Sequence, residues 1–128
     1  MPADHDGIMS NAMSISASGM QAASLRLEAA ASNIVNMDSG GYQPVSVSQS
    51  PTQDGGVSAS LQPVTPASLL AYDPASPYAT VQGMVAQPNV DLATEIVNMK
   101  QASHDFRASL LAYKASSKMF ETLLDATA

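Results

Sequence analysis

Histidine and carboxylate side chains are the first candidates for chemistry in this 128-residue sequence. The two histidines are His5, near the N-terminus, and His104, which directly precedes Asp105. Adjacent residues point to different sides of a helix, so His104 and Asp105 would not form a general base and its orienting acid. Asp91 and Glu95 would share a helical face, but no histidine or third ligand accompanies them. We therefore predict neither a catalytic site nor a metal site.

The other residue types that carry chemistry also lack partners. Neither Gly40-Gly41 nor Gly55-Gly56 is followed by the Gly-Lys-Ser/Thr of a phosphate-binding loop. The serines are numerous, but no base is positioned beside them. The 8 methionines fall at helical spacing, which is more typical of packing than of a soft-metal site. Cysteine is absent, which excludes thiol chemistry and disulfides. We expect no enzyme, no cofactor and no small-molecule substrate.

Composition and charge limit the partners further. The net charge of −6 comes from 11 acidic and 5 basic residues without charge runs, which argues against nucleic-acid binding. No stretch approaches the ~18 apolar residues of a membrane-spanning helix, so we expect no direct membrane insertion. The first 11 residues have no basic region of the kind that begins a cleaved signal peptide. Aromatic residues are only 5% of the sequence, so any core is thin.

Two segments repeat apolar residues at alternating intervals of three and four. Such a repeat averages 3.5 residues and keeps one stripe of a helix against a partner. We predict a mainly α fold in which helices over 12–38 and 91–127 pair as an antiparallel coiled coil. The residues expected to form the intrachain seam are Leu27, Ile34, Met37, Ile96, Met99, Phe106, Leu110 and Phe120. Gly19 falls within the first helix, either to admit a close backbone or as a tolerated weakness of ~1 kcal/mol.

Polar residues gather near the facing ends of the two predicted helices. Buried amides at such places specify alignment, as asparagine does in coiled-coil cores, whereas the simpler alternative is helix capping. The residues expected to set the register of assembly are Asn33, Asn36, Gly41, Tyr42, Asn89, Asp91, Glu95 and Asn98.

The remaining segments are expected to be less regular. Residues 1–11 are polar and are predicted to form a flexible leader. Residues 39–90 are predicted to hold a small β-hairpin followed by an extended Pro-rich connector. The hairpin is indicated by alternating residues in 42–48 and 57–61 around a turn signal at 52–56. Within the connector, a short strand is expected at 83–85.

Particular residues at the helix ends resemble a known family. Ser32-Asn33-Ile34-Val35-Asn36, followed by Gly41-Tyr42, and the run from Pro88 to Met99 resemble the two signatures of bacterial flagellar axial proteins of the rod and hook. Segments 72–74, 77–79 and 83–85 are most similar to the C-type subunits of the proximal rod of the basal body.

This resemblance implies a structural, non-enzymatic subunit of the periplasm-spanning rod. Its partners would be copies of itself, other flagellar rod subunits and the type III export apparatus, which would export it unfolded without a cleaved signal peptide. Helical assembly would then transmit torque from motor to hook. The alternatives are another axial position (distal rod or hook-proximal) and a stand-alone helical-hairpin interaction module, with an enzyme as a third hypothesis.

Overall fold

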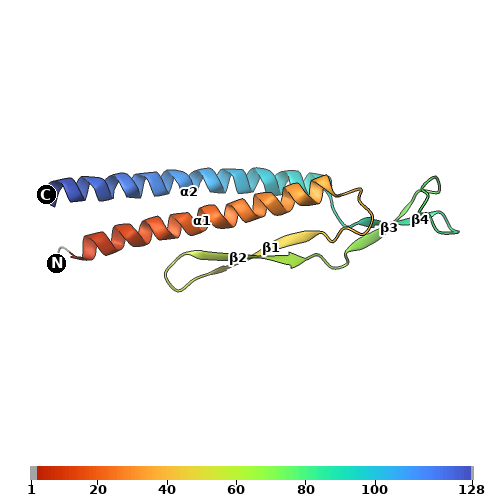
Figure 1. The fold of residues 1–128 in the computed structure, drawn as a ribbon, viewed down its shortest axis with the longest axis horizontal. Helices are drawn as coiled ribbons and strands as arrows, with labels where there is room; N and C mark the ends of the chain where they lie inside the picture. Colours follow the sequence, from red (N-terminus) through yellow and green to blue (C-terminus); the bar gives the residue numbers. More distant parts are fainter. Residues whose placement is uncertain (1–2, 128) are drawn as a thin grey trace.

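Two long helices and two strand pairs make up the described part of the chain, residues 3–127 of the computed structural model, with side chains described from residue 7. Helices α1 (Ala3–Val35) and α2 (Leu92–Thr127) lie side by side and run in opposite directions (Figure 1). Strands β1 (Val45–Pro51) and β2 (Val57–Pro63) lie along α1, which therefore contacts α2 and the hairpin. Strands β3 (Ser68–Tyr72) and β4 (Met84–Pro88) extend beyond the end of the helix pair at which α1 ends and α2 begins.

Helix α1 begins nine residues before the expected start at residue 12. The predicted flexible leader is helical from Ala3, and only residues 1 and 2 of it lie outside the described part. Met9 is partly buried and extends the apolar spacing of Met13 back toward the N-terminus, which explains the earlier start. The helix ends at Val35 instead of residue 38, and hydrogen-bonded turns lead to Gly41, whose φ of 82° is the left-handed conformation that glycine adopts readily.

Helix α2 begins and ends close to the predicted bounds. Asp91 precedes the first residue, and its carboxylate accepts a 2.7 Å hydrogen bond from the Thr94 hydroxyl while its carbonyl accepts one from the Glu95 amide. Glu95 lies in the first turn, where a negative charge favours the positive end of the helix dipole.

The first strand pair is the predicted hairpin. β1 and β2 are antiparallel with Val47 opposite Leu61, and the turn between them spans residues 52–56 with Gly55 at a φ of 92°. Burial alternates at the start of each strand, because Val45, Val47, Val57 and Ala59 face α1 while the residues between them face solvent.

A second antiparallel pair occupies much of the segment expected to be an extended connector. β3 pairs with β4, with Leu70 opposite Ala86, and β4 includes part of the short strand predicted at 83–85. The prolines of this segment lie between or at the ends of the strands, where no ladder hydrogen bond is lost. Nearly all residues of β3 are exposed, so its sequence lacks the alternation of apolar and polar residues that marks a strand buried on one face. The sequence pattern therefore did not predict this strand.

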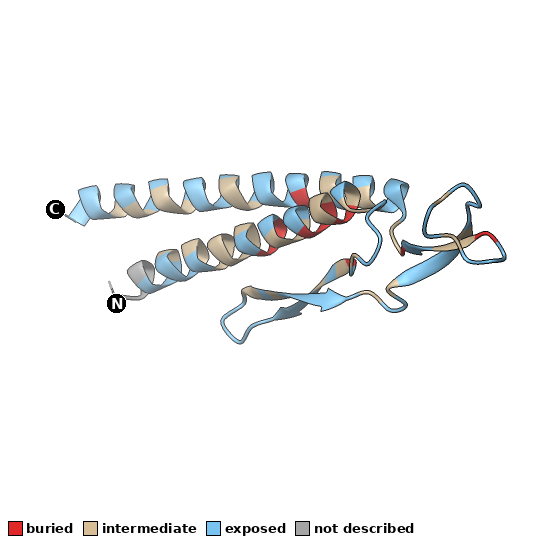
Figure 2. Ribbon diagram, turned by 45° about the vertical axis from the view of Figure 1, so that its right-hand side comes forward, coloured by how far each residue is buried: buried red, intermediate tan, exposed pale blue. Residues whose placement is uncertain are grey.

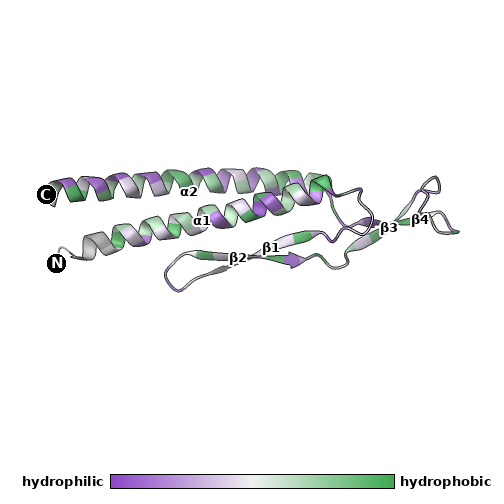
Figure 3. Cartoon of the chain, in the orientation of Figure 1, coloured by the Kyte–Doolittle hydropathy of each residue, from purple (hydrophilic) through white to green (hydrophobic). Residues whose placement is uncertain are grey.

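The interior of the molecule is built from small residues. Among the residues whose side chains are described, the buried apolar ones are Ala22, Ala23, Ala29, Ala30 and Ala102 of the helices and Pro44 and Pro88 outside them, and the one buried polar side chain is Asn33. Figure 2 shows the buried positions of α1 and α2 toward the end where the helices meet the strands. Hydrophobic residues nevertheless continue along both helices (Figure 3), and many large ones remain exposed.

Candidate functional site

The two helices touch along a line of small and polar residues. A Cβ atom added at Gly19 would lie 2.6 Å from the Ser109 Oγ, so glycine here admits the other helix, one of the two roles expected for it. Fourteen residues further along α1, the Asn33 amide lies 3.3 Å from the Glu95 carboxylate, and Glu95 is fourteen residues before Ser109. The contacts therefore repeat over two heptads.

Between these two contacts lies an ion pair that joins the helices. The Arg26 guanidinium donates a 2.6 Å hydrogen bond to the Asp105 carboxylate, with the Arg26 side chain 21% exposed and Asp105 58% exposed. Exposed pairs of this kind contribute roughly 0–1 kcal/mol, so this one serves alignment more than stability. Arg26 is the one basic residue of the chain outside α2, which is the sequence signal that could have identified it.

Asn33 forms the polar centre of the junction between α1, β1 and α2. Its side chain is 2% exposed. The amide nitrogen donates to the Val45 carbonyl at 2.7 Å and to Glu95, and the amide oxygen accepts from the Val45 N–H at 3.1 Å and the Tyr42 hydroxyl at 2.9 Å. Both donor and both acceptor positions of the Asn33 amide are occupied. The two bonds with Val45 involve its N–H and its carbonyl, as do the bonds that a residue of a neighbouring strand makes.

Tyr42 extends this network toward the surface of α1. Its hydroxyl donates to Asn33 and accepts from the Ser32 hydroxyl at 2.9 Å. Gly41, directly before it, supplies the left-handed backbone that turns the chain from α1 toward β1. Asn36, by contrast, bonds only the Ser32 carbonyl one turn earlier, at 2.9 Å. Ser32 was absent from the predicted set, although it begins the run Ser32-Asn33-Ile34-Val35-Asn36 on which the family resemblance rests.

The remaining predicted register residues lie apart from Asn33. Asn89 donates through its side chain to the Pro66 carbonyl at 3.0 Å and through its backbone to Ala67, which ties the chain before α2 to the chain before β3. Asp91 directly precedes α2, and its carboxylate accepts a hydrogen bond from the Thr94 hydroxyl in the first turn. Asn98 is exposed and lines a hollow with Glu95 and Val45. The structure therefore brings together Asn33, Tyr42 and Glu95 of the predicted set, and their role in assembly stays a prediction.

The residues predicted to form the seam lie beside the deepest contact line. Leu27, Ile96 and Phe106 are exposed in the chain alone, by 36% to 42%, whereas the other five (Ile34, Met37, Met99, Leu110 and Phe120) are partly buried. The deepest position of α2 is Ala102, which is 0% exposed and lies between the Ser109 and Glu95 contacts. The signal that could have found it is the spacing of seven among Glu95, Ala102 and Ser109.

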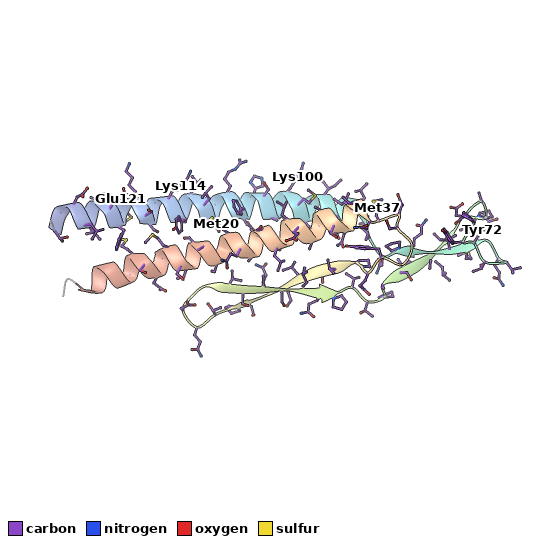
Figure 4. The ribbon with its side chains drawn as sticks, in the orientation of Figure 1. Met20, Met37, Tyr72, Lys100, Lys114 and Glu121 are labelled. Carbon is purple, nitrogen blue, oxygen red and sulfur yellow. The ribbon has the colours of Figure 1, made fainter. Side chains whose placement is uncertain are left out.

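The basic residues of α2 form an outward-facing line. Lys100, Arg107, Lys114 and Lys118 are four of the five basic residues of the chain. In Figure 4 the side chains of Lys100 and Lys114 point away from α1. Bases that are dispersed in the sequence are therefore collected on one side by the helical repeat.

Two classes of site can be assessed over the described residues. Within 3–127, no three histidine and carboxylate side chains come close enough to hold a metal ion. No helix in that range has the length and hydrophobicity needed to cross a membrane.

Comparisons with known proteins place these features in a family of structural proteins. Residues 13–43 match the model described as flagella basal body rod protein, and residues 81–126 match that of the C-terminal region of flagellar basal body rod FlgEFG proteins. These two ranges contain Asn33, Tyr42 and all the α2 contacts described above.

Similar curated proteins agree along nearly the whole length. The flagellar basal-body rod protein FlgC of Aquifex aeolicus is 30% identical, with 91% of this chain and 95% of the relative covered. FlgC of Salmonella typhimurium is 36% identical over 88% of this chain and 94% of the relative, and FlgC of Escherichia coli is 34% identical over the same shares. The chain belongs to the flagellar basal-body rod protein family and is FlgC-like. It is thus a structural component of the basal-body rod and not an enzyme.

Proposed function

We propose that this chain is a subunit of the proximal rod, exported unfolded by the flagellar type III apparatus and assembled helically with copies of itself and other rod subunits. In this role it transmits torque from motor to hook. The similarity to proteins named FlgC over about nine-tenths of the chain supports the rod assignment, and the geometry of the helix pair supports the mechanical role.

The observation that carries the proposal is the contrast between the interior and the surface. The buried apolar residues of the two helices are all alanines, whereas Leu27, Ile96 and Phe106 remain substantially exposed. Alanine removes little apolar area from water, so the single chain gains little from its own core. Neighbouring subunits would bury the large side chains and complete the fold, as expected for a protein that crosses the export channel unfolded.

The helix pair acts in this proposal as an antiparallel coiled coil. Its contacts at Gly19 and Asn33 recur after two heptads, and small residues at Gly19 and Ala102 let the backbones approach closely. Side-by-side helices resist shear along their length, because sliding would break the Arg26–Asp105 and Asn33–Glu95 contacts together.

Phe106→Asp tests the proposal in a cell that lacks the native copy. A charge at this half-exposed position would oppose burial by neighbours. We expect export of the variant to remain measurable while its incorporation into purified basal bodies and swimming are lost. His104→Asp is the matched control, because His104 is an exposed polar residue of the same helix, and its substitution removes no large apolar side chain from a neighbour. Normal swimming of the Phe106→Asp strain, or absence of the native chain from basal bodies, would contradict the proposal.

A further inference from the structure

Helix α1 presents different residues on its two sides. The hairpin lies on the side of Ile15 and Ser18: the Ser18 hydroxyl oxygen accepts a 3.1 Å hydrogen bond from the Val57 N–H, and Ile15 lies against Gly55. Gly19 faces α2. Each residue advances about 100° around a helix, so Met20, one position after Gly19, lies on the side away from the hairpin.

Helix α2 is divided in the same way. Ala108 and Ala112 line a hollow together with Gly55 of the hairpin turn, so this side of α2 faces the hairpin. Ser109 faces α1. Leu110 and Phe106, which are displaced from Ser109 in the other rotational direction, lie on the side away from the hairpin.

The sides away from the hairpin form one surface, here called the apolar face. It comprises residues spaced by seven on α1 and by three and four on α2: Met20, Leu27 and Ile34, with Phe106, Leu110 and Tyr113. Leu27, Phe106 and Tyr113 are between 36% and 39% exposed, so the contact between the helices covers only part of these side chains. Among the described residues, nothing else packs on this face.

The opposite side of the helix pair is concave. One hollow of about 190 Å³ lies between α2 and β1, lined in part by Ala29, Val45 and Asn98. A second, of about 360 Å³, lies further along and is lined in part by Gly55, Ala108 and Ala112. These six residues define the hairpin-side groove, whose dimensions suit projecting apolar side chains. The two hollows are roughly two heptads apart along α2, which matches the repeat of the apolar face.

Charge distinguishes the apolar face from the groove. Each apolar position at Met99, Phe106 and Tyr113 is directly followed by a base, so Lys100, Arg107 and Lys114 border the apolar face. Carboxylates outnumber bases along the groove: Glu95 lines the first hollow, where the charge of Arg26 is balanced by its ion pair with Asp105, and exposed Asp54 precedes Gly55 at the second. One surface is therefore apolar with a basic edge, and the other is hollowed with an acidic edge.

We infer that the apolar face of one copy docks into the hairpin-side groove of the next copy. The inference rests on the proposed rod function and identifies which surfaces meet. Because the two surfaces differ, the contact is heterologous, and repetition generates an open array instead of a closed dimer. Large side chains enter the hollows, and the bases meet the carboxylates of the neighbour, which fixes the direction of stacking.

Cysteine cross-linking tests this contact, because the native chain has no cysteine. Ser103→Cys places a thiol on the side of the apolar face, and Ala108→Cys places one in the groove; both positions are exposed. The full-length variants are produced separately and together in cells lacking the native copy, and treated with a short bismaleimide. Basal bodies are purified, swimming is scored, and cross-linked peptides are identified by mass spectrometry.

We expect dimers joined through residues 103 and 108 when the two variants are mixed, and few dimers from either alone. A chain carrying both changes should give a ladder of higher oligomers, since the two thiols lie on opposite sides of α2 and cannot join within one chain. Changing Lys100, Arg107 and Lys114 together to glutamine should lower the yield several-fold, whereas Lys118→Gln should leave it unchanged.

Two results would overturn the inference. Ser103→Cys alone dimerising as efficiently as the mixture would show a symmetric contact between two apolar faces. Swimming cells whose basal bodies contain both variants but no 103–108 product would exclude this contact and leave the rod function intact. Absence of the cysteine-free native chain from basal bodies would instead remove the proposed function, and the inference with it.

Discussion

The two strand pairs of this molecule share a topology but differ in what covers them. β1–β2 lies against α1, and Val45, Val47 and Val57 are partly buried there. β3–β4 contacts neither helix within the described residues, and Leu70 and Tyr72 are 68% and 73% exposed. A two-stranded sheet alone is marginal in water, so the first pair is stabilised by α1 and the second has only its own ladder and turns.

Side chains of α1 anchor the first pair at both ends. Asn33 pairs with the backbone of Val45 at the start of β1, and Ser18 accepts from the Val57 N–H at the start of β2. No helix side chain makes such a hydrogen bond to β3 or β4 among the described residues. The comparison indicates that the position of a hairpin here is set by side-chain to backbone bonds from a helix as well as by its turn.

The largest effect on this difference is expected from Asn33→Leu. The change leaves the Val45 N–H and carbonyl without the buried amide that they bond, at about 1–3 kcal/mol for an unsatisfied group, whereas the Tyr42 hydroxyl retains Ser32 as a partner. We expect amide-exchange protection at Val45 to fall by roughly 30-fold or more, which is about 2 kcal/mol.

Asn36→Leu is the matched control for Asn33→Leu. The Asn36 side chain bonds only the Ser32 carbonyl, so its loss should leave exchange at Val45 nearly unchanged. Amide exchange at Val85 in β4 should respond to neither substitution. Equal effects of the two substitutions on Val45 would mean that the hydrogen bonds of Asn33 do not hold β1 in place.

A pair of serine substitutions measures the contribution of burial directly. Val47→Ser removes a partly buried apolar side chain facing α1, and we expect a loss of roughly 1 kcal/mol in the stability of β1–β2. Leu70→Ser removes an exposed side chain from β3, and a change within about 0.5 kcal/mol is expected in the isolated chain. Amide exchange of each strand pair gives both values. A larger loss from Leu70→Ser would show that β3–β4 has a partner within the chain.

The same difference in covering explains how much of the fold could be predicted from the sequence. The first hairpin was predicted because burial on one face produces alternation at Val45–Val47 and because 52–56 is a strong turn signal. β3 has no such alternation, since both of its faces are exposed, and it was interpreted as connector. Helix type and α2 bounds followed from the heptad spacing, whereas the early start of α1 was missed because polar residues near the N-terminus resemble a tail.

The candidate site was predictable in its residue types more than in its geometry. Asn33, Tyr42 and Glu95 were identified before the structure placed them together. The pairing of Asn33 with Val45 could not be inferred, because it depends on how the chain turns at Gly41. The seam prediction favoured large residues such as Phe106, but Gly19 and Ala102 permit a closer helix approach, so the deepest contact line lies beside the apolar stripe.

The smallest effect is expected at the turn of the first hairpin, where Asp54 accepts hydrogen bonds from the Thr52 hydroxyl and, at 3.4 Å, the Gly56 N–H. These hydrogen bonds lower the pKa of Asp54 below its ordinary value of 3.8, and the bond from Thr52 has the larger effect. A depressed folded-state pKa means that the stabilisation is present above pH 3.8 and is lost as the pH falls through the folded-state value. The group is fully exposed, so the change should be confined to the turn.

NMR titration should show the Gly56 amide shifting at that lower pH, with β3–β4 unaffected, and Asp54→Asn should abolish the transition. A Gly56 transition at or above 3.8 would show that the carboxylate is not held by Thr52.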